Sequence, residues 1–218
     1  MRDRFNSQLE QLYTEVREMG EICITAIESA GKAVLNNVKD ENEFETICVD
    51  VKGYEEEVDH RERNIENLCV TLMLHQQPVA SDLRTVTSAH RLISDMERIG
   101  DQALDIVELA KYLHKLNVDS KIHLNALFAE VISMVKNAVG SFTNKELQTA
   151  YKVINDDDKV DALFVKVKSE LIDIIRNGVE GELPLDILMV AKYIERIGDH
   201  AVNIANWVVY SITGEHQI

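Results

Sequence analysis

The sequence predicts an all-α protein in which six long helices form two repeated three-helix bundles packed side by side. Apolar residues recur at three- and four-residue steps along almost the whole chain, which is the spacing of one helix face. Turn-forming residues are scarce, with two prolines and nine glycines in 218 residues, whereas a β-sandwich or barrel needs a turn about every ten residues. One five-residue segment also occurs twice, once in each half. These observations favour a duplicated helical fold.

The first half contains three predicted helices. The apolar series from Leu9 to Ala30 predicts the first helix, and the polar, acidic stretch 36–42 predicts the turn after it. A second helix is expected over 43–75. Pro78 follows it and marks the start of a third helix, which runs to about residue 115, because proline is well tolerated in a first helical turn.

The second half repeats this order of elements. We expect a break at 117–121 and three further helices at 122–142, 144–177 and 184–213. Gly178 and Gly181 end the fifth helix, and Pro184 opens the sixth.

The duplication is visible in the residues themselves. The segment Glu97-Arg98-Ile99-Gly100-Asp101 recurs 98 positions later at 195–199, and the Val-Asp pair at 58–59 recurs at 160–161. Helices of about 30 residues span about 45 Å, so each unit is elongated. The predicted repeats are residues 1–116 and 117–218.

Composition excludes several classes of function. The net charge of −15 repels phosphate backbones, so we expect no nucleic-acid partner. We see no signal peptide and no apolar run of the roughly 18 residues that a membrane span needs, so no direct membrane insertion is expected. Three widely spaced cysteines without a C-x-x-C motif are typical of reduced thiols in a cytosolic protein.

Acidic residues form four pairs at i, i+4 spacing, at matching places in the two halves. Residues four apart share a helix face, and carboxylate oxygens are the ligands that hard cations prefer. Two such pairs on adjacent helices can converge on one metal site, which gives one site in each half. The alternative is a solvated acidic face paired with arginine and lysine side chains, and both interpretations stay open. The pairs are Glu55 and Asp59, Glu97 and Asp101 (extended by Asp105), Asp157 and Asp161, and Glu195 and Asp199.

Each repeated segment contains a glycine directly before its second acidic residue. A glycine inside a helix costs about 1 kcal/mol relative to alanine, yet Gly100 and Gly198 occupy the same place in both halves. The missing side chain lets a second helix or a ligand approach closely. Arg98 and Arg196 point about 100° away from the adjacent glutamates, toward neighbouring helices or an acidic partner.

The doubled Glu-Arg-Ile-Gly-Asp segment, the Val-Asp pairs and the stretch QPVASDLR at 77–84 resemble the PhoU family of phosphate-uptake regulators over nearly the whole chain. The resemblance implies two similar three-helix bundles, usually in a homodimer. It implies a cytoplasmic, non-enzymatic negative regulator of phosphate uptake and of the phosphate regulon. Its partners would be the ATPase subunit of a phosphate ABC transporter, which would hold it at the inner face of the membrane, and a PhoR-type sensor histidine kinase.

The resemblance also concerns metals and partner contacts. Some relatives bind multinuclear metal clusters through E/D-x-x-x-D motifs, and these motifs match the four acidic pairs here, with iron, zinc, manganese or magnesium as candidate ions. The arginines of the shared segments, Arg84, Arg98 and Arg196, are candidate partner-binding residues. The halves differ in two places: Asn203 stands where the first half has Asp105, and Phe164 where it has Glu62. We therefore expect weaker metal binding in the second half.

Two other functions are alternatives to a phosphate regulator. A ferritin-type carboxylate-bridged di-iron enzyme or metal storage protein needs Glu-x-x-His on two helices, and the chain offers one match, Glu57 to His60. A purely structural helical scaffold explains the helices and leaves the matched acidic pairs unexplained. The sequence also lacks the G-x-x-x-x-G-K-[ST] motif, so no ATP hydrolysis is expected.

Overall fold

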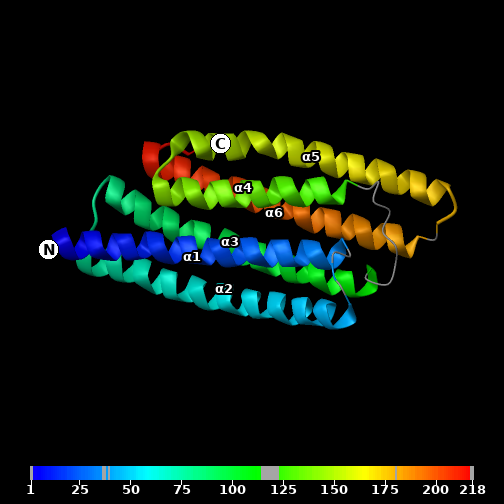
Figure 1. Cartoon of the computed structure of the whole chain (residues 1–218). Coiled ribbons are helices and arrows are strands. Elements are labelled where there is room, and N and C mark those ends of the chain that lie inside the picture. The colour runs from blue at the N-terminus through cyan, green and yellow to red at the C-terminus, as the bar shows by residue number, and fades with distance from the viewer. Residues whose placement is uncertain (1, 36–37, 39, 114–122, 180, 217–218) are drawn as a thin grey trace.

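The computed structural model describes every residue except 1, 36–37, 39, 114–122, 180 and 217–218. The described part holds six α-helices and no strand, which confirms the predicted fold class (Figure 1). The predicted break at 117–121 and the boundary between residues 116 and 117 lie outside the described residues. The helices are α1 (Arg2–Val34), α2 (Glu41–Gln76), α3 (Ser81–Leu113), α4 (Leu124–Asn144), α5 (Leu147–Arg176) and α6 (Glu182–Thr213).

Three helix ends differ from the sequence prediction because of local backbone conformation. The third helix begins at Ser81 and not at Pro78, since Gln77 and Ala80 adopt left-handed conformations with φ of 47° and 49°. The residue before a proline is disfavoured in the right-handed helical region, which accounts for the interruption at Gln77. Lys145 is also left-handed, at φ 59°, and its N–H donates to the carbonyl of Phe142 at 3.3 Å. The fourth helix thus extends past residue 142, and the fifth starts at Leu147.

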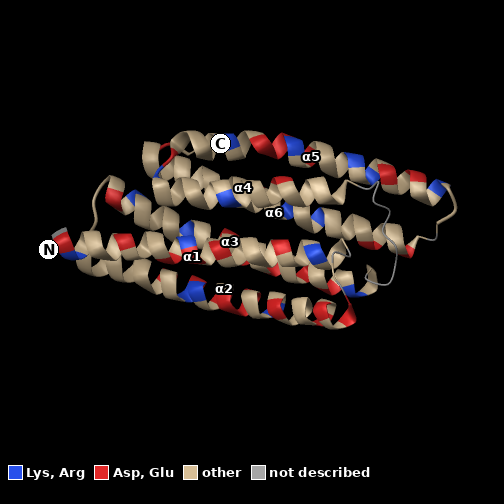
Figure 2. Ribbon diagram, in the orientation of Figure 1, with Lys and Arg blue, Asp and Glu red and all other residues tan. Residues whose placement is uncertain are grey.

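The outer helices, α2 and α5, bury a narrow stripe of side chains, whereas the inner helices, α3 and α6, bury a wide one. Along α2 the buried residues Phe44, Val51, Val58, Ile65 and Leu72 follow each other at seven-residue intervals. Seven residues make almost two full turns of a helix, so these side chains form one nearly straight line that faces the core. The rest of α2 carries mostly charged and polar residues, and charged residues also recur along α5 (Figure 2). By contrast, α3 and α6 are buried on several sides by neighbouring helices.

Each half is a three-helix bundle, and two helix pairs join the halves. Helices α1, α2 and α3 pack together, as do α4, α5 and α6, while α1 contacts α4 and α3 contacts α6 (Figure 1). The α3–α6 pair is antiparallel, because Arg91 lies over the ring of Trp207 and Asp95 accepts a hydrogen bond from Asn203. None of the described helices combines the length and apolar character needed to span a bilayer.

The α1–α4 contact depends on a glycine. A Cβ atom placed on Gly20 would lie 2.6 Å from Cγ1 of Val139, closer than such carbon atoms approach. Val139 is itself buried and β-branched, so its side chain has little freedom to move away. The missing side chain at residue 20 therefore lets α1 and α4 approach across the boundary between the halves.

We expect Gly20→Ala to lower the free energy of unfolding by about 1–3 kcal/mol, because it overpacks this contact. Gly53→Ala is the matched control, since a Cβ there meets nothing within 4 Å and alanine favours a helix by up to about 1 kcal/mol. Urea unfolding followed by circular dichroism measures both. Adding Val139→Ala to Gly20→Ala should recover part of the loss; a Gly20→Ala protein as stable as the Gly53→Ala protein would contradict this view of the contact.

Candidate functional site

Carboxylates from α2 and α3 meet near the middle of both helices. Gly100 allows this approach, because a Cβ on it would lie only 3.3 Å from Cγ1 of Val58 on α2. Asp59 follows Val58 directly, so it is brought beside the repeated segment of α3. We call this group of half-buried side chains the first acidic cluster: Glu55, Asp59, Glu62, Glu97 and Asp101, with Asp105 one turn further along α3.

The first acidic cluster concentrates negative charge in a partly desolvated place. The pKa of Glu97 is raised to about 6, mainly by burial and then by the neighbouring charge of Asp101, while Arg98 opposes the shift. Burial also raises the pKa of Glu55, with contributions from Asp59 on its own helix and Asp101 across the interface. The pKa of Asp105 is raised mainly by burial and then by Asp101. The carboxylates thus disfavour each other's ionised forms.

Arg98 provides the positive charge closest to this cluster. Its Nη1 donates to Oδ2 of Asp101 at 2.9 Å, and its Nε lies 3.3 Å from Oε2 of Glu97. The side chain therefore folds back onto the carboxylates of its own helix and does not reach a neighbouring helix. It is 59% exposed, so these ion pairs are largely solvated and contribute little to stability.

A second acidic cluster lies between α5 and α6 and consists of Asp157, Asp161, Glu195 and Asp199. Gly198 has the same role here as Gly100, because a Cβ on it would lie 3.4 Å from Cγ1 of Val160. The pKa of Asp157 is raised to about 6, mainly by burial and then by the charges of Asp161, Asp199 and Glu195. The pKa of Asp199 is raised by burial and by Glu195, while Lys192 and His200 lower it. All four predicted acidic pairs thus come together as two groups.

The two clusters differ in one pair of facing positions. In the first half Oγ of Ser94 donates to Oε1 of Glu62 at 2.9 Å. The corresponding residues of the second half are Lys192 and Phe164, and the lysine Nζ lies 5.6 Å from the centre of that ring. Lys192 also donates to Glu195. The second cluster therefore has one carboxylate fewer and an amine of its own. The sequence predicts the exchange of Glu62 for Phe164, and the exchange of Ser94 for Lys192 is visible in the same alignment of the two repeats.

The second difference between the halves is explained by the contact between α3 and α6. Oδ1 of Asp95 accepts hydrogen bonds from Nδ2 of Asn203 at 3.0 Å and pairs with Nδ1 of His200 at 2.9 Å. An aspartate in place of Asn203 would place a second carboxylate beside that of Asp95. On the other side of the pair, the charge of Arg196 lowers the pKa of Asp105, which burial otherwise raises. These residues therefore connect the halves, a role that sequence reasoning missed because it requires the antiparallel pairing.

Arg84 lies at the end of α6. A Cβ on Gly214 would lie 3.4 Å from Cζ of Arg84, so the guanidinium packs against the last turn of that helix. Its Nε is buried and has no hydrogen-bond partner among the described residues. The structure gives Arg84 a packing position between the halves, and its predicted contact with a partner protein stays a prediction.

The donor set of each acidic cluster fits a hard cation, although the present side-chain positions do not. Within the described part of the chain, no group of three or more His, Cys, Asp or Glu side chains is placed to hold a metal ion. Arg98 and Lys192 occupy carboxylate oxygens that an ion would use. The Glu-x-x-His match does not contribute, since Nε of Arg61 donates to Oε1 of Glu57 at 2.9 Å and His60 is exposed. The ferritin-type interpretation is therefore not favoured.

Comparison with known proteins gives a consistent result over the whole chain. The PhoU domain matches residues 16–110 and 124–208. A phosphate-specific transport system accessory protein PhoU homolog from Clostridium acetobutylicum is 33% identical, with 97% of this chain and 95% of the relative covered. The homolog from Xylella fastidiosa strain 9a5c is 31% identical over 98% of this chain and 89% of its own length.

Solved structures show the same architecture. The crystal structure of PhoU from Pseudomonas aeruginosa matches with a TM-score of 0.87 at 28% identity, over 97% of this chain and all of that one. The PhoU structure from Streptococcus pneumoniae, described as a phosphate transport system regulatory protein, matches with a TM-score of 0.88 at 21% identity, over 98% and 99% of the two chains. This second likeness concerns the fold alone.

Fold, repeat and acidic clusters together define a class of protein: a duplicated three-helix bundle with a carboxylate cluster on the inner helix of each repeat. The chain belongs to the PhoU family. The resemblance inferred from the repeated segments is thereby confirmed.

We expect Glu97→Gln to raise the free energy of unfolding by about 0.5–1 kcal/mol at pH 7.5, after allowing for solvent screening. The folded protein holds the Glu97 proton more tightly than the unfolded chain, so the contribution of this group to stability falls as pH rises from about 4 through about 6. At pH 4.5 the carboxyl is already protonated, and the variant should gain almost nothing. Urea unfolding at the two pH values measures this, with Glu28→Gln on the exposed side of α1 as control. An equal effect at both pH values would show that the change in stability does not come from the charge of Glu97.

Proposed function

We propose that the protein is an accessory regulator of phosphate-specific transport. The observation that carries this proposal is the match to PhoU homologs named as phosphate-specific transport system accessory proteins, over almost the full length of both chains. The proposal needs no catalytic step by this chain. A regulator of this type requires a surface whose binding changes with the state of a partner.

The finer part of the proposal is an adaptor. The protein would contact the ATPase subunit of a phosphate ABC transporter and a PhoR-type sensor histidine kinase, and it would decrease both uptake and expression of the phosphate regulon when phosphate is plentiful. The transporter would hold it at the cytoplasmic face of the membrane. The polar outer faces of α2 and α5 support this role, because they leave two long helical surfaces available to partners (Figure 2).

We also propose that the protein forms a homodimer. Apolar side chains are exposed around the end of α5 and the start of α6, which is the kind of surface that a second copy covers. The residues concerned are Ile172, Ile175, Val179, Leu185 and Met189.

Divalent cations are the third part of the proposal. The first acidic cluster would hold them through Glu55, Asp59, Glu97 and Asp101, and the second through Asp157, Asp161, Glu195 and Asp199. Raised carboxylate pKa values support cation binding, since a bound cation would relieve the repulsion between these groups. Oxygen ligands suit magnesium and manganese, and carboxylate clusters also hold iron. A bound cation would displace the guanidinium of Arg98 from the carboxylates of the first cluster and the amine of Lys192 from those of the second.

Deletion of the gene in its native host should raise phosphate-responsive transcription in phosphate-rich medium to the level seen in starvation. A reporter fused to a phosphate-responsive promoter measures this, and the wild-type gene on a plasmid should restore repression. The Gly53→Ala gene is the matched control for expression level. Unchanged low transcription in the deletion strain would refute negative regulation and leave the family assignment intact.

We expect manganese to bind the first acidic cluster more tightly than the second, because the first has one carboxylate more and no lysine. Asp101→Asn should weaken the tighter binding at least about tenfold, and Asp199→Asn should affect the weaker binding alone. Arg98→Gln should strengthen the tighter binding, since it removes the competing guanidinium. Calorimetry and elemental analysis of dialysed protein measure these effects. Metal-free protein, or binding that none of these variants changes, would show that the carboxylates have a different role.

A further inference from the structure

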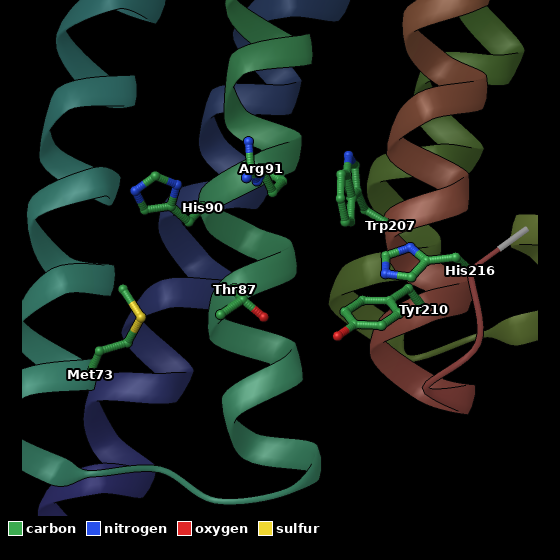
Figure 3. A pocket seen from close by; sticks show the side chains of 7 residues that line it. All are labelled: Met73, Thr87, His90, Arg91, Trp207, Tyr210 and His216. Atoms are coloured by element: carbon green, nitrogen blue, oxygen red, sulfur yellow. The ribbon is translucent and has the colours of Figure 1, made fainter. Parts of the chain in front are cut away.

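A cleft of about 500 Å³ lies across α3 where the two halves meet. Met73 of α2 borders it on one side, Thr87 and Arg91 of α3 lie in the middle, and the C-terminal part of α6 borders it on the other side (Figure 3). Its volume is in the range of small-molecule sites. A second hollow of about 220 Å³ continues it along α6, where Asn203 and Asn206 contribute amide groups.

Three rings form one side of the cleft, and we call them the aromatic wall: Trp207, Tyr210 and His216. Trp207 and Tyr210 pack edge to face with ring centres 6.1 Å apart, and the His216 ring stacks on Tyr210 at 4.1 Å. Figure 3 shows these rings facing Thr87 and Arg91 across the opening. Trp207 and Tyr210 are half-buried, and Trp207 packs against the hydrophobic core. Planar ring surfaces of this kind bind aromatic ligands by stacking.

The cleft contains a guanidinium in a strongly acidic protein. Among the described residues that line it, none is acidic, Arg91 is a cation, and His90 and His216 contribute imidazole rings. The Arg91 guanidinium lies 6.0 Å from the centre of the Trp207 ring, so the cation and the ring surface are adjacent. One carboxylate approaches from α2, with Oε1 of Glu66 3.7 Å from Nε2 of His90. Arg91 has no ion pair with any described residue, so its charge is available to an anion.

We propose that this cleft binds a nucleotide, with the planar base against the aromatic wall and the phosphate groups at Arg91 and His90. A stacking surface beside a guanidinium matches the two chemical parts of such a ligand, and arginine binds phosphate oxygens through paired N–H groups. The amide of Asn206 offers hydrogen bonds to the edge of the base. The inference does not depend on the proposed function. Because the cleft is formed by both halves, a bound nucleotide would contact both.

The chain contains a single tryptophan, and it lies in this cleft, so intrinsic fluorescence reports on the site. Titration of the full chain with ATP, ADP and GTP should quench the emission of Trp207 in a saturable way, and calorimetry should give the same affinity. Arg91→Gln should weaken binding at least about tenfold. Arg176→Gln on the exposed end of α5 is the matched control and should leave binding unchanged. Trp207→Phe, followed by calorimetry, should weaken binding and keep the fold.

Three outcomes would overturn the proposal. Pyrophosphate binding as tightly as ATP would show a simple anion site, and adenosine binding as tightly as ATP would show that the arginine does not hold phosphate. Absence of saturable binding for all three nucleotides at millimolar concentration would show that the cleft does not take them. Circular dichroism of each variant confirms that a loss of binding is not a loss of folding.

Discussion

The antiparallel contact between α3 and α6 is the constraint on which the rest of the molecule depends. Both helices are buried on several sides, so they are at once the inner helix of their own bundle and the link to the other bundle. Asp95, His200 and Asn203 provide a polar contact between these two helices. Because the repeated segments occupy the middle of these two helices, the same pairing places both acidic clusters at a similar level along the molecule, one on each side.

Sequence patterns predicted the helices and the composition of the clusters well, because both depend on local spacing. Apolar periodicity located all six helices, and the i, i+4 rule placed each acidic pair on one face. The errors arose where a single backbone conformation decides, as at Gln77 and Lys145, which adopt left-handed conformations that side-chain identity does not indicate. The cleft at Trp207 could not be predicted, since its two sides come from helices more than 100 residues apart and their register follows from three-dimensional packing.

The glycines of the repeated segments connect packing to electrostatics. Gly100 and Gly198 lie against Val58 and Val160, and both valines precede an aspartate of the acidic clusters. The close helix approach therefore also forces carboxylates together, and it accounts for the raised pKa values of Glu97 and Asp157. Close helix packing and access for a ligand are thus compatible roles for these glycines. The packing brings carboxylates together, and a cationic ligand would bind to that concentrated negative charge.

The heptad stripe of α2 has a consequence for the dynamics of the native state. Helix α2 buries fewer residues for its length than α3, so we expect it to separate from the bundle at a lower free energy than α3 unfolds. Helix α2 carries Glu55, Asp59 and Glu62, so such an opening would disperse the first acidic cluster while α3 stays in place. Amide hydrogens on the outer helix should then exchange faster than those on α3, and any cation that bridges the two helices would slow that exchange. The same narrow contact that leaves most of α2 open to partners thereby makes its position adjustable.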